Sequence, residues 1–155
     1  MEENEVGLSL LRCGRYPNPE ADRETHEATY CVLPHAGTWQ SAGVVKEAYL
    51  LNNPLQAFAG HGEGTLPQVL SLASADKENV MVEVVKQAED SDATVLRLYE
   101  FENTATETVI TLPEKAKAIW LCDMLERKER LLAENTDHLT LRIAPFEIVS
   151  LLAEG

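Results

Sequence analysis

Apolar and polar residues alternate with a period of two along most of the chain, which is the pattern of β-strands that bury one face. From residue 80 to residue 84 every second residue is valine, and in the segment 95–99 Leu96 and Leu98 share a face while Arg97 points the other way. About nine segments follow this pattern and are predicted as strands. They are residues 6–12, 28–33, 68–74, 80–86, 95–99, 106–112, 116–121, 138–143 and 146–152.

Polar turns such as 89–92 and 134–137 separate the predicted strands at a spacing of roughly 8 to 12 residues. A series of short strands at this spacing is typical of two antiparallel sheets packed face to face. The sequence therefore predicts a mainly all-β fold, an antiparallel β-sandwich of about nine strands.

One segment follows a helical pattern instead. Apolar residues recur at three- and four-residue steps from Trp39 to Tyr49, after Thr38, which can cap a helix N-terminus. Pro54 ends the pattern because proline cannot continue the helical hydrogen bonds and restricts the residue before it. We expect one helix of about 14 residues that covers an edge or an open end of the sandwich.

Composition and charge narrow the functional classes. The 155 residues are 45% hydrophobic and 25% charged, as in an ordinary globular domain. The formal net charge of -13 disfavours nucleic acid and anionic membrane surfaces as partners. The acidic first residues are unlike a signal peptide, and no apolar run approaches the roughly 20 residues of a membrane span. We therefore expect a soluble, cytoplasmic protein.

The side chains that carry catalysis or bind metals form no known motif in this sequence. Three cysteines lie far apart without a Cys-x-x-Cys pair, which favours reduced core thiols over a disulfide framework or a zinc site. The four histidines lack the spacing of a helical zinc motif, and there is neither a Gly-x-Ser-x-Gly turn nor a phosphate-binding loop. The 26 acidic residues offer many possible pairs, but no spacing selects one for glycoside hydrolysis. From the residues alone we predict no metal site and no self-contained active site.

Five stretches of the chain nevertheless carry a family resemblance, in order along the sequence. They are residues 8–22, with Glu-Ala-Asp at 20–22; residues 26–35, ending in Leu-Pro-His; residues 42–55, ending in Asn-Asn-Pro-Leu; residues 82–100; and the pair 123–126 and 145–148, the latter reading Pro-Phe-Glu-Ile. Together these stretches resemble the C-terminal domain of the α-mannosidases of glycoside hydrolase family 38, of the bacterial type.

The resemblance implies that residues 1–155 form a single C-terminal β-sandwich domain of a larger enzyme. In this family the zinc ligands, the nucleophile and the acid/base carboxylate belong to an N-terminal domain, which is absent from this chain. The resemblance thus implies an accessory, structural domain of a zinc-dependent, retaining α-mannosidase. We expect this chain to hold no cofactor and to be inactive alone. Its expected partners are the upstream catalytic domain and, for the whole enzyme, a mannose-containing glycan.

Arg12 is the one candidate site residue. It ends the first predicted strand at a long acidic loop, residues 16–27, and the resemblance implies that this segment lies close to the active site of family members. We therefore expect Arg12 to contact substrate in the full-length enzyme only. The alternative is a surface arginine paired with Glu20 or Asp22.

Two other functional classes compete with the accessory role. An independent carbohydrate-binding module needs exposed aromatic side chains on which sugars stack. The aromatic content is only 6%, and Trp39 and Trp120 occupy core-like positions, so the sequence gives the module little support. A free-standing hydrolase with an unrecognised site is the third hypothesis, for which no motif speaks.

Overall fold

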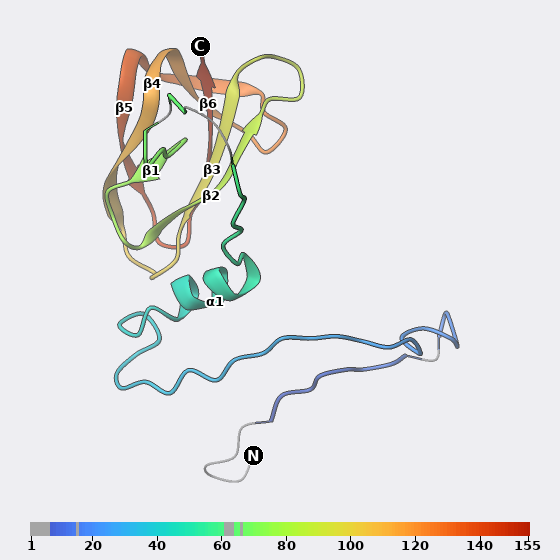
Figure 1. Cartoon of the computed structure of the whole chain (residues 1–155). Helices are drawn as coiled ribbons and strands as arrows, with labels where there is room; N and C mark the ends of the chain where they lie inside the picture. Colours follow the sequence, from blue (N-terminus) through green and yellow to red (C-terminus); the bar gives the residue numbers. More distant parts are fainter. Residues whose placement is uncertain (1–6, 15, 61–63, 66) are drawn as a thin grey trace. The chain divides into compact units, whose positions relative to one another are not determined.

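The computed structural model describes residues 7–14, 16–60, 64–65 and 67–155. The chain forms two compact units, residues 1–44 and residues 45–155. All strands of the described residues lie in the second unit and form one antiparallel sheet of six strands (Figure 1). The elements are α1 (Val44–Asn52), β1 (Ser74–Ala75), β2 (Val80–Gln87), β3 (Thr94–Glu100), β4 (Thr106–Cys122), β5 (Lys128–Ile143) and β6 (Ile148–Glu154).

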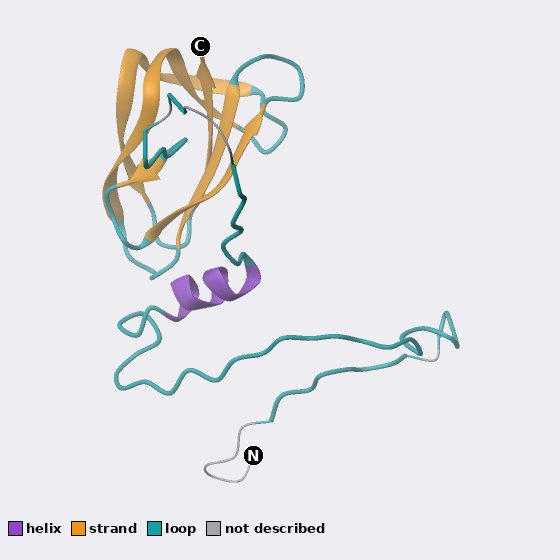
Figure 2. Cartoon of the chain, in the orientation of Figure 1, coloured by secondary structure: helices purple, strands orange, loops and turns teal. Residues whose placement is uncertain are grey.

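Strand β4 organises the sheet. The strand order is β1-β4-β6-β3-β2, and β5 pairs with β4 outside this path. The first half of β4 pairs with β1, and its last five residues, 118–122, pair with β6, while β5 runs along nearly all of it. Figure 2 shows the strands curling around a common interior. The predicted all-β, antiparallel fold class is confirmed.

A bulge bends β4 at its middle. The pairing of β4 with β5 passes from Thr111 opposite His138 directly to Ala116 opposite Thr136, so residues 112–115 face a single residue of β5. Pro113 lies in this bulge, where it has no N–H to donate to the ladder. The two predicted strands 106–112 and 116–121 are therefore one bent strand, β4.

The apolar side chains that alternate along the strands form the hydrophobic core, as predicted. Leu96 and Leu98 are 1% and 0% exposed, whereas Arg97 between them lies on the outer face and is partly exposed. The main cluster comprises Val80, Leu96, Leu98, Ile110, Leu112, Ala116, Ile119, Leu139, Ile143, Val149, Leu151 and Ala153. A second, smaller cluster around Val95, Cys122 and Leu152 covers the opposite side of the sheet.

Three of the predicted strands do not form, so the expected count of about nine was too high. Residues 7–12, 28–33 and 68–73 have no ladder partner, and Val6 lies outside the described residues. An alternating pattern specifies which face a strand buries, but a strand also needs a neighbour to hydrogen-bond. Leu8, Tyr30 and Val32 are 68%, 62% and 82% exposed, so the apolar faces of the first two segments are left uncovered.

The helix is shorter than predicted because Gly43 interrupts it. Thr38 caps a separate turn, in which its Oγ1 accepts a hydrogen bond from the N–H of Ser41 at 3.3 Å. Gly43 then adopts φ +65°, and Val44 N–H donates back to the carbonyl of Trp39 at 3.2 Å, the bond that ends a helix at a left-handed residue. Helix α1 starts only after this stop and has nine residues.

Helix α1 forms an exposed ion pair with the connection between β1 and β2. None of its residues is buried, and Lys46 Nζ lies 3.4 Å from a carboxylate oxygen of Glu78, in the connection between β1 and β2. An exposed ion pair of this kind contributes little to stability. Neither α1 nor any other helix of the described residues has the length and apolar character required to cross a membrane.

Glu100 joins the end of β3 to two other parts of the sheet. Its side chain is 1% exposed, and it accepts hydrogen bonds from the N–H groups of Phe146 and Glu102 at 3.0 and 2.7 Å and from Asn79 Nδ2 at 2.9 Å. Burial alone raises the pKa of Glu100, but these hydrogen bonds outweigh it and hold the pKa below the usual value. The carboxylate is therefore a buried structural acceptor.

Glu126 plays a similar part at the tip of the β4–β5 hairpin. Its side chain is only 8% exposed and forms ion pairs with Lys86 Nζ at 2.8 Å and with Arg97 Nη2 at 3.6 Å. Its other oxygen accepts the N–H of Glu89 at 2.8 Å. Together with the carbonyl of Met124, which accepts a hydrogen bond from Arg97 Nη2 at 3.1 Å, Glu126 binds the hairpin tip to β2 and β3.

Asp76 fixes β1 to β4. Its carboxylate accepts hydrogen bonds from Lys77 Nζ at 2.8 Å, from Val109 N–H at 2.7 Å and from Thr108 Oγ1 at 2.9 Å. The hydrogen bond from Lys77, followed by those from Val109 and Thr108, lowers the pKa of Asp76 from 3.8 to about 2.

This lowered pKa predicts how stability depends on pH. A carboxylate with a depressed pKa stabilises the folded state above its unfolded pKa of 3.8, and this contribution disappears as the pH falls towards the folded pKa of about 2. Urea unfolding at a series of pH values below 5 should therefore show a shallower loss of stability in Asp76→Asn than in the unchanged chain. Asp90→Asn, at an exposed turn residue, is the matched control and should keep the original slope. Equal slopes for all three proteins would contradict this role of Asp76.

Candidate functional site

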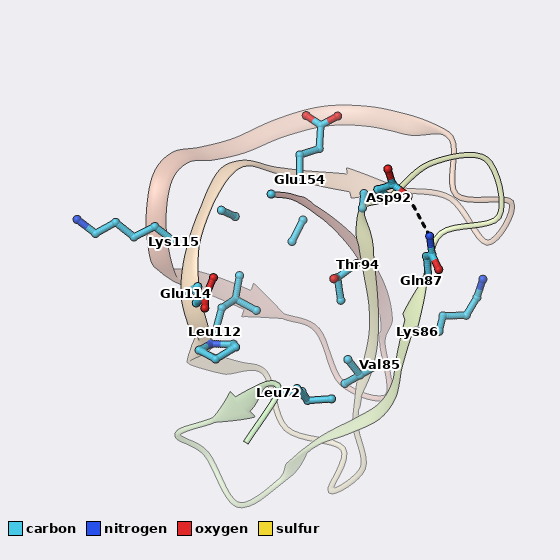
Figure 3. A pocket seen from close by; sticks show the side chains of 15 residues that line it. Leu72, Val85, Lys86, Gln87, Asp92, Thr94, Leu112, Glu114, Lys115 and Glu154 are labelled. Carbon is cyan, nitrogen blue, oxygen red and sulfur yellow. Dashed lines mark hydrogen bonds between the residues drawn. The ribbon is translucent and has the colours of Figure 1, made fainter. Parts of the chain in front are cut away.

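An open pocket of about 490 Å³ lies where the bulge of β4 meets the ends of β2 and β6 and the start of β3. Leu72, Val85 and Leu112 contribute apolar side chains to its wall. Figure 3 shows Lys86 and Lys115 pointing away from it. Its rim also carries the acids Asp92, Glu114 and Glu154.

Two of these acids are already engaged with neighbouring side chains. Asp92 accepts a hydrogen bond from Gln87 Nε2 at 3.1 Å, the dashed line in Figure 3. Glu154 accepts hydrogen bonds from Lys128 Nζ and from Trp120 Nε1, the latter at 3.0 Å. The bond from Lys128, then that from Trp120, lowers the pKa of Glu154. The pocket therefore holds an ionised, hydrogen-bonded carboxylate.

Carboxyl chemistry in the described residues differs from that of a glycosidase centre. A glycoside hydrolase needs one acid whose pKa is raised, so that it can protonate the leaving oxygen. The carboxyl groups with a shifted pKa in the described ranges are all shifted downward: Asp76, Glu100, Glu126 and Glu154. Each accepts hydrogen bonds that join strands or turns, so these acids serve the fold.

The two tryptophans differ in their surroundings. Lys128 Nζ lies 5.0 Å from the centroid of the Trp120 ring, and the indole N–H is bound to Glu154, so this partly buried ring is occupied on a face and at its edge. Trp39, in the first unit, is 39% exposed, and its predicted core-like position is wrong. Trp120 therefore offers no free platform for a sugar ring.

The described residues do not converge on a metal. They contain no group of three or more His, Cys, Asp or Glu side chains that could hold an ion, whereas zinc needs three or four protein ligands around one point. The histidines that the structure describes make local contacts, and His61 lies outside them. The contacts are His26 Nε2 with the carbonyl of Asp22 at 3.1 Å, His35 Nδ1 with the carbonyl of Ala36 at 3.4 Å, and His138 Nδ1 with Asp137 Oδ1 at 2.8 Å.

The cysteines follow the prediction only in part. All three are free thiols. Cys122 is buried in the smaller core cluster, and this burial raises the pKa of its thiol. Cys13 and Cys31 are exposed, so the expectation of core thiols is wrong for them.

Arg12 is exposed in the first unit, next to a loop with its own internal contacts. Glu20 pairs with Arg23 through Nη1 at 2.6 Å, and the carbonyl of Asp22 accepts hydrogen bonds from His26 and Cys13. Among the described residues no ion pair joins Arg12 to Glu20 or Asp22. The role of Arg12 in substrate binding stays a prediction.

Phe146 is an exposed aromatic residue that the sequence places in a predicted strand, 146–152, whereas β6 begins only at Ile148. It occupies the left-handed region at φ 57° and is 56% exposed, in the turn between β5 and β6. An aromatic residue rarely adopts this conformation. The Pro-Phe-Glu-Ile motif contains it, but neither glycine nor asparagine marks the position in the sequence.

Comparisons with known proteins identify a matching family and several relatives of this chain. Residues 79–151 match the family described as "Glycosyl hydrolases family 38 C-terminal beta sandwich domain". The chain is 38% identical over 152 residues to Alpha-mannosidase 2C1 of Homo sapiens, a match that covers 95% of this chain and 14% of that protein. Alpha-mannosidase 2C1 of Mus musculus is 36% identical, with 96% and 15% covered, and Alpha-mannosidase G of Dictyostelium discoideum is 36% identical, with 92% and 14% covered.

The chain thus spans only 14% to 15% of the length of these relatives. The three organisms are eukaryotes, so the comparisons do not bear out the bacterial type that the sequence suggested. The family itself is confirmed: in residues 79–151 the chain belongs to the C-terminal β-sandwich domains of glycosyl hydrolases family 38.

Proposed function

We propose that residues 1–155 are the C-terminal accessory part of an α-mannosidase that removes terminal α-mannosides from glycans. One observation carries the proposal: proteins named as α-mannosidases match 92% to 96% of this chain, yet it covers only 14% to 15% of them. A region of this size that matches nearly end to end is a component of a larger enzyme. In this proposal the catalytic domain lies upstream in the same polypeptide.

The side chains of this chain fit a supporting role. The carboxylates with shifted pKa values hold strands and turns together, and each is stabilised in its ionised form. Zinc, when bound in the upstream domain, supplies a Lewis acid to the retaining reaction. Three free cysteines accord with the reducing environment of the cytoplasm, where we place the enzyme.

The first unit gives the proposal a structural reason. Its segments 7–12 and 28–33 have the alternating pattern of strands but expose their apolar side chains, including Leu8 at 68% and Val32 at 82%. Apolar side chains that alternate along an extended backbone are suited to a sheet with a covered face. We infer that the rest of the enzyme supplies the neighbouring strands and the cover for both segments.

Activity measurements on two proteins test the proposal. The full-length polypeptide should hydrolyse an aryl α-mannoside, because it includes the proposed catalytic domain. Residues 1–155 alone, supplied with zinc at the same concentration, should give no turnover above the buffer. A circular dichroism spectrum with β-sheet content would show that the shorter protein is folded in this assay. Turnover by the 155-residue chain, or an inactive full-length protein, would contradict the proposal.

The role of Arg12 is tested in the full-length enzyme. Arg12→Ala should lower kcat/KM for an α-mannoside by about 10-fold or more, since a hydrogen bond from a charged group to a bound ligand is worth about 1.5–3 kcal/mol. Arg23→Ala is the control, because Arg23 pairs with Glu20 within the same loop. If both kcat and KM stay unchanged in Arg12→Ala, Arg12 does not contact the substrate.

A further inference from the structure

The outer face of the sheet carries an apolar patch that the described residues leave uncovered. Tyr99 of β3 stands opposite Ile148 of β6, and its ring meets that of Phe101 edge to face at 6.2 Å. Ile148 is 65% exposed and Phe146, in the adjoining turn, is 56% exposed. With Glu100 beneath them, these side chains line a shallow hollow of about 330 Å³. We name Tyr99, Phe146 and Ile148, together with the ring of Phe101, which is only 6% exposed, the Phe146 patch.

The turn that presents Phe146 is rigidly held in its unusual conformation. The N–H of Phe146 donates to the buried carboxylate of Glu100 at 3.0 Å, and the N–H of Glu100 donates to the carbonyl of Glu147 at 3.1 Å. Within the turn, Ala144 N–H donates to the Glu147 side chain at 2.6 Å, and Glu147 N–H returns a bond to the carbonyl of Ala144 at 3.1 Å. The exposed ring therefore belongs to a turn that is fixed from both sides.

A preorganised aromatic side chain beside an apolar hollow is the arrangement of an interface anchor, because little conformational entropy is lost when it is buried. The exposed side chains of Phe146 and Ile148 contribute no burial energy to the fold. A left-handed backbone conformation is also energetically unfavourable for a bulky residue, and residues in such conformations cluster at functional sites. These features indicate a surface that is covered in the working protein.

We propose that the Phe146 patch is the surface by which this domain docks on the upstream part of its own polypeptide. This inference rests on the proposed function, since relatives extend far beyond this chain, which covers only 14% to 15% of their length. Glu147, next to Phe146 in the chain, is exposed, and the chain carries a formal net charge of -13. The complementary surface in this proposal is therefore an apolar pocket bordered by lysine or arginine side chains.

Hydroxyl-radical footprinting of the full-length protein tests the docking surface. The labelling rate of each side chain is measured by mass spectrometry and divided by its rate in the urea-unfolded protein. Leu98, 0% exposed, and Leu125, 68% exposed in the β4–β5 turn, serve as internal references for buried and free side chains. Phe146 and Ile148 should be protected to the level of Leu98. Labelling of both at the level of Leu125 would overturn the inference.

A pair of variants tests the same surface energetically. Phe146→Asn removes the ring but retains the turn, because asparagine tolerates the left-handed region. In the full-length protein it should speed the release of this domain by a protease several-fold, while Leu125→Asn, the matched control at an exposed turn residue, should not. Equal release rates for both variants and the unchanged protein would overturn the inference.

The outcomes separate this inference from the proposed function. If the full-length protein hydrolyses an α-mannoside while Phe146 is labelled freely, the accessory role stands and the docking surface is refuted. If the protein is inactive on α-mannosides, the proposed function fails whatever the labelling. If protection of Phe146 disappears when the protein is diluted from a dimer to a monomer, as followed by light scattering, the occupant is a second copy and the inference is again refuted.

Discussion

The structure of this domain depends on the hydrogen bonding of β4 (Thr106–Cys122) to three different neighbours. A straight strand can satisfy at most two neighbours, one along each edge, over its whole length. Strand β4 bends at residues 112–115, and its two halves share β5 but pair on the other edge with β1 and with β6. Leu112, Pro113 and Ala116 contribute to the lining of the pocket at this bend, so the pocket follows from the bulge in β4.

Carboxylate side chains add hydrogen bonds to those formed between paired strands. Asp76 binds N–H and hydroxyl donors of β4, Glu100 binds the turn before β6, and Glu126 binds the β2–β3 hairpin. Each of these acids has a lowered pKa because its charged form accepts several hydrogen bonds. An acidic chain of net charge -13 thus uses part of its charge to fix its turns.

Hydrophobic alternation was enough to predict the fold class and the inner faces of β3 and of residues 138–143, because side chains on a strand point to opposite faces in turn. The turn predicted at residues 134–137 is wrong, because β5 continues through it from Lys128 to Ile143. The alternation could not show that residues 7–12 and 28–33 have no ladder partner among the described residues, because strand pairing depends on residues far away in the sequence. Helical periodicity likewise ran through Gly43, whose left-handed φ ends the first turn. The left-handed backbone of Phe146 could not be predicted for a related reason. It is held by a hydrogen bond to Glu100, which is distant in the sequence, and not by the conformational preference of phenylalanine.

We propose that this chain is one component of a larger enzyme, which completes its first unit and covers its outer face. Amide hydrogen exchange in the full-length protein, followed at residues 7–12 and 28–33, measures whether both segments gain partner strands. We expect slow exchange at alternate amides of both segments, because each becomes a hydrogen-bonded strand of the assembled protein. Exchange at the rate of an unstructured peptide throughout both segments would contradict it.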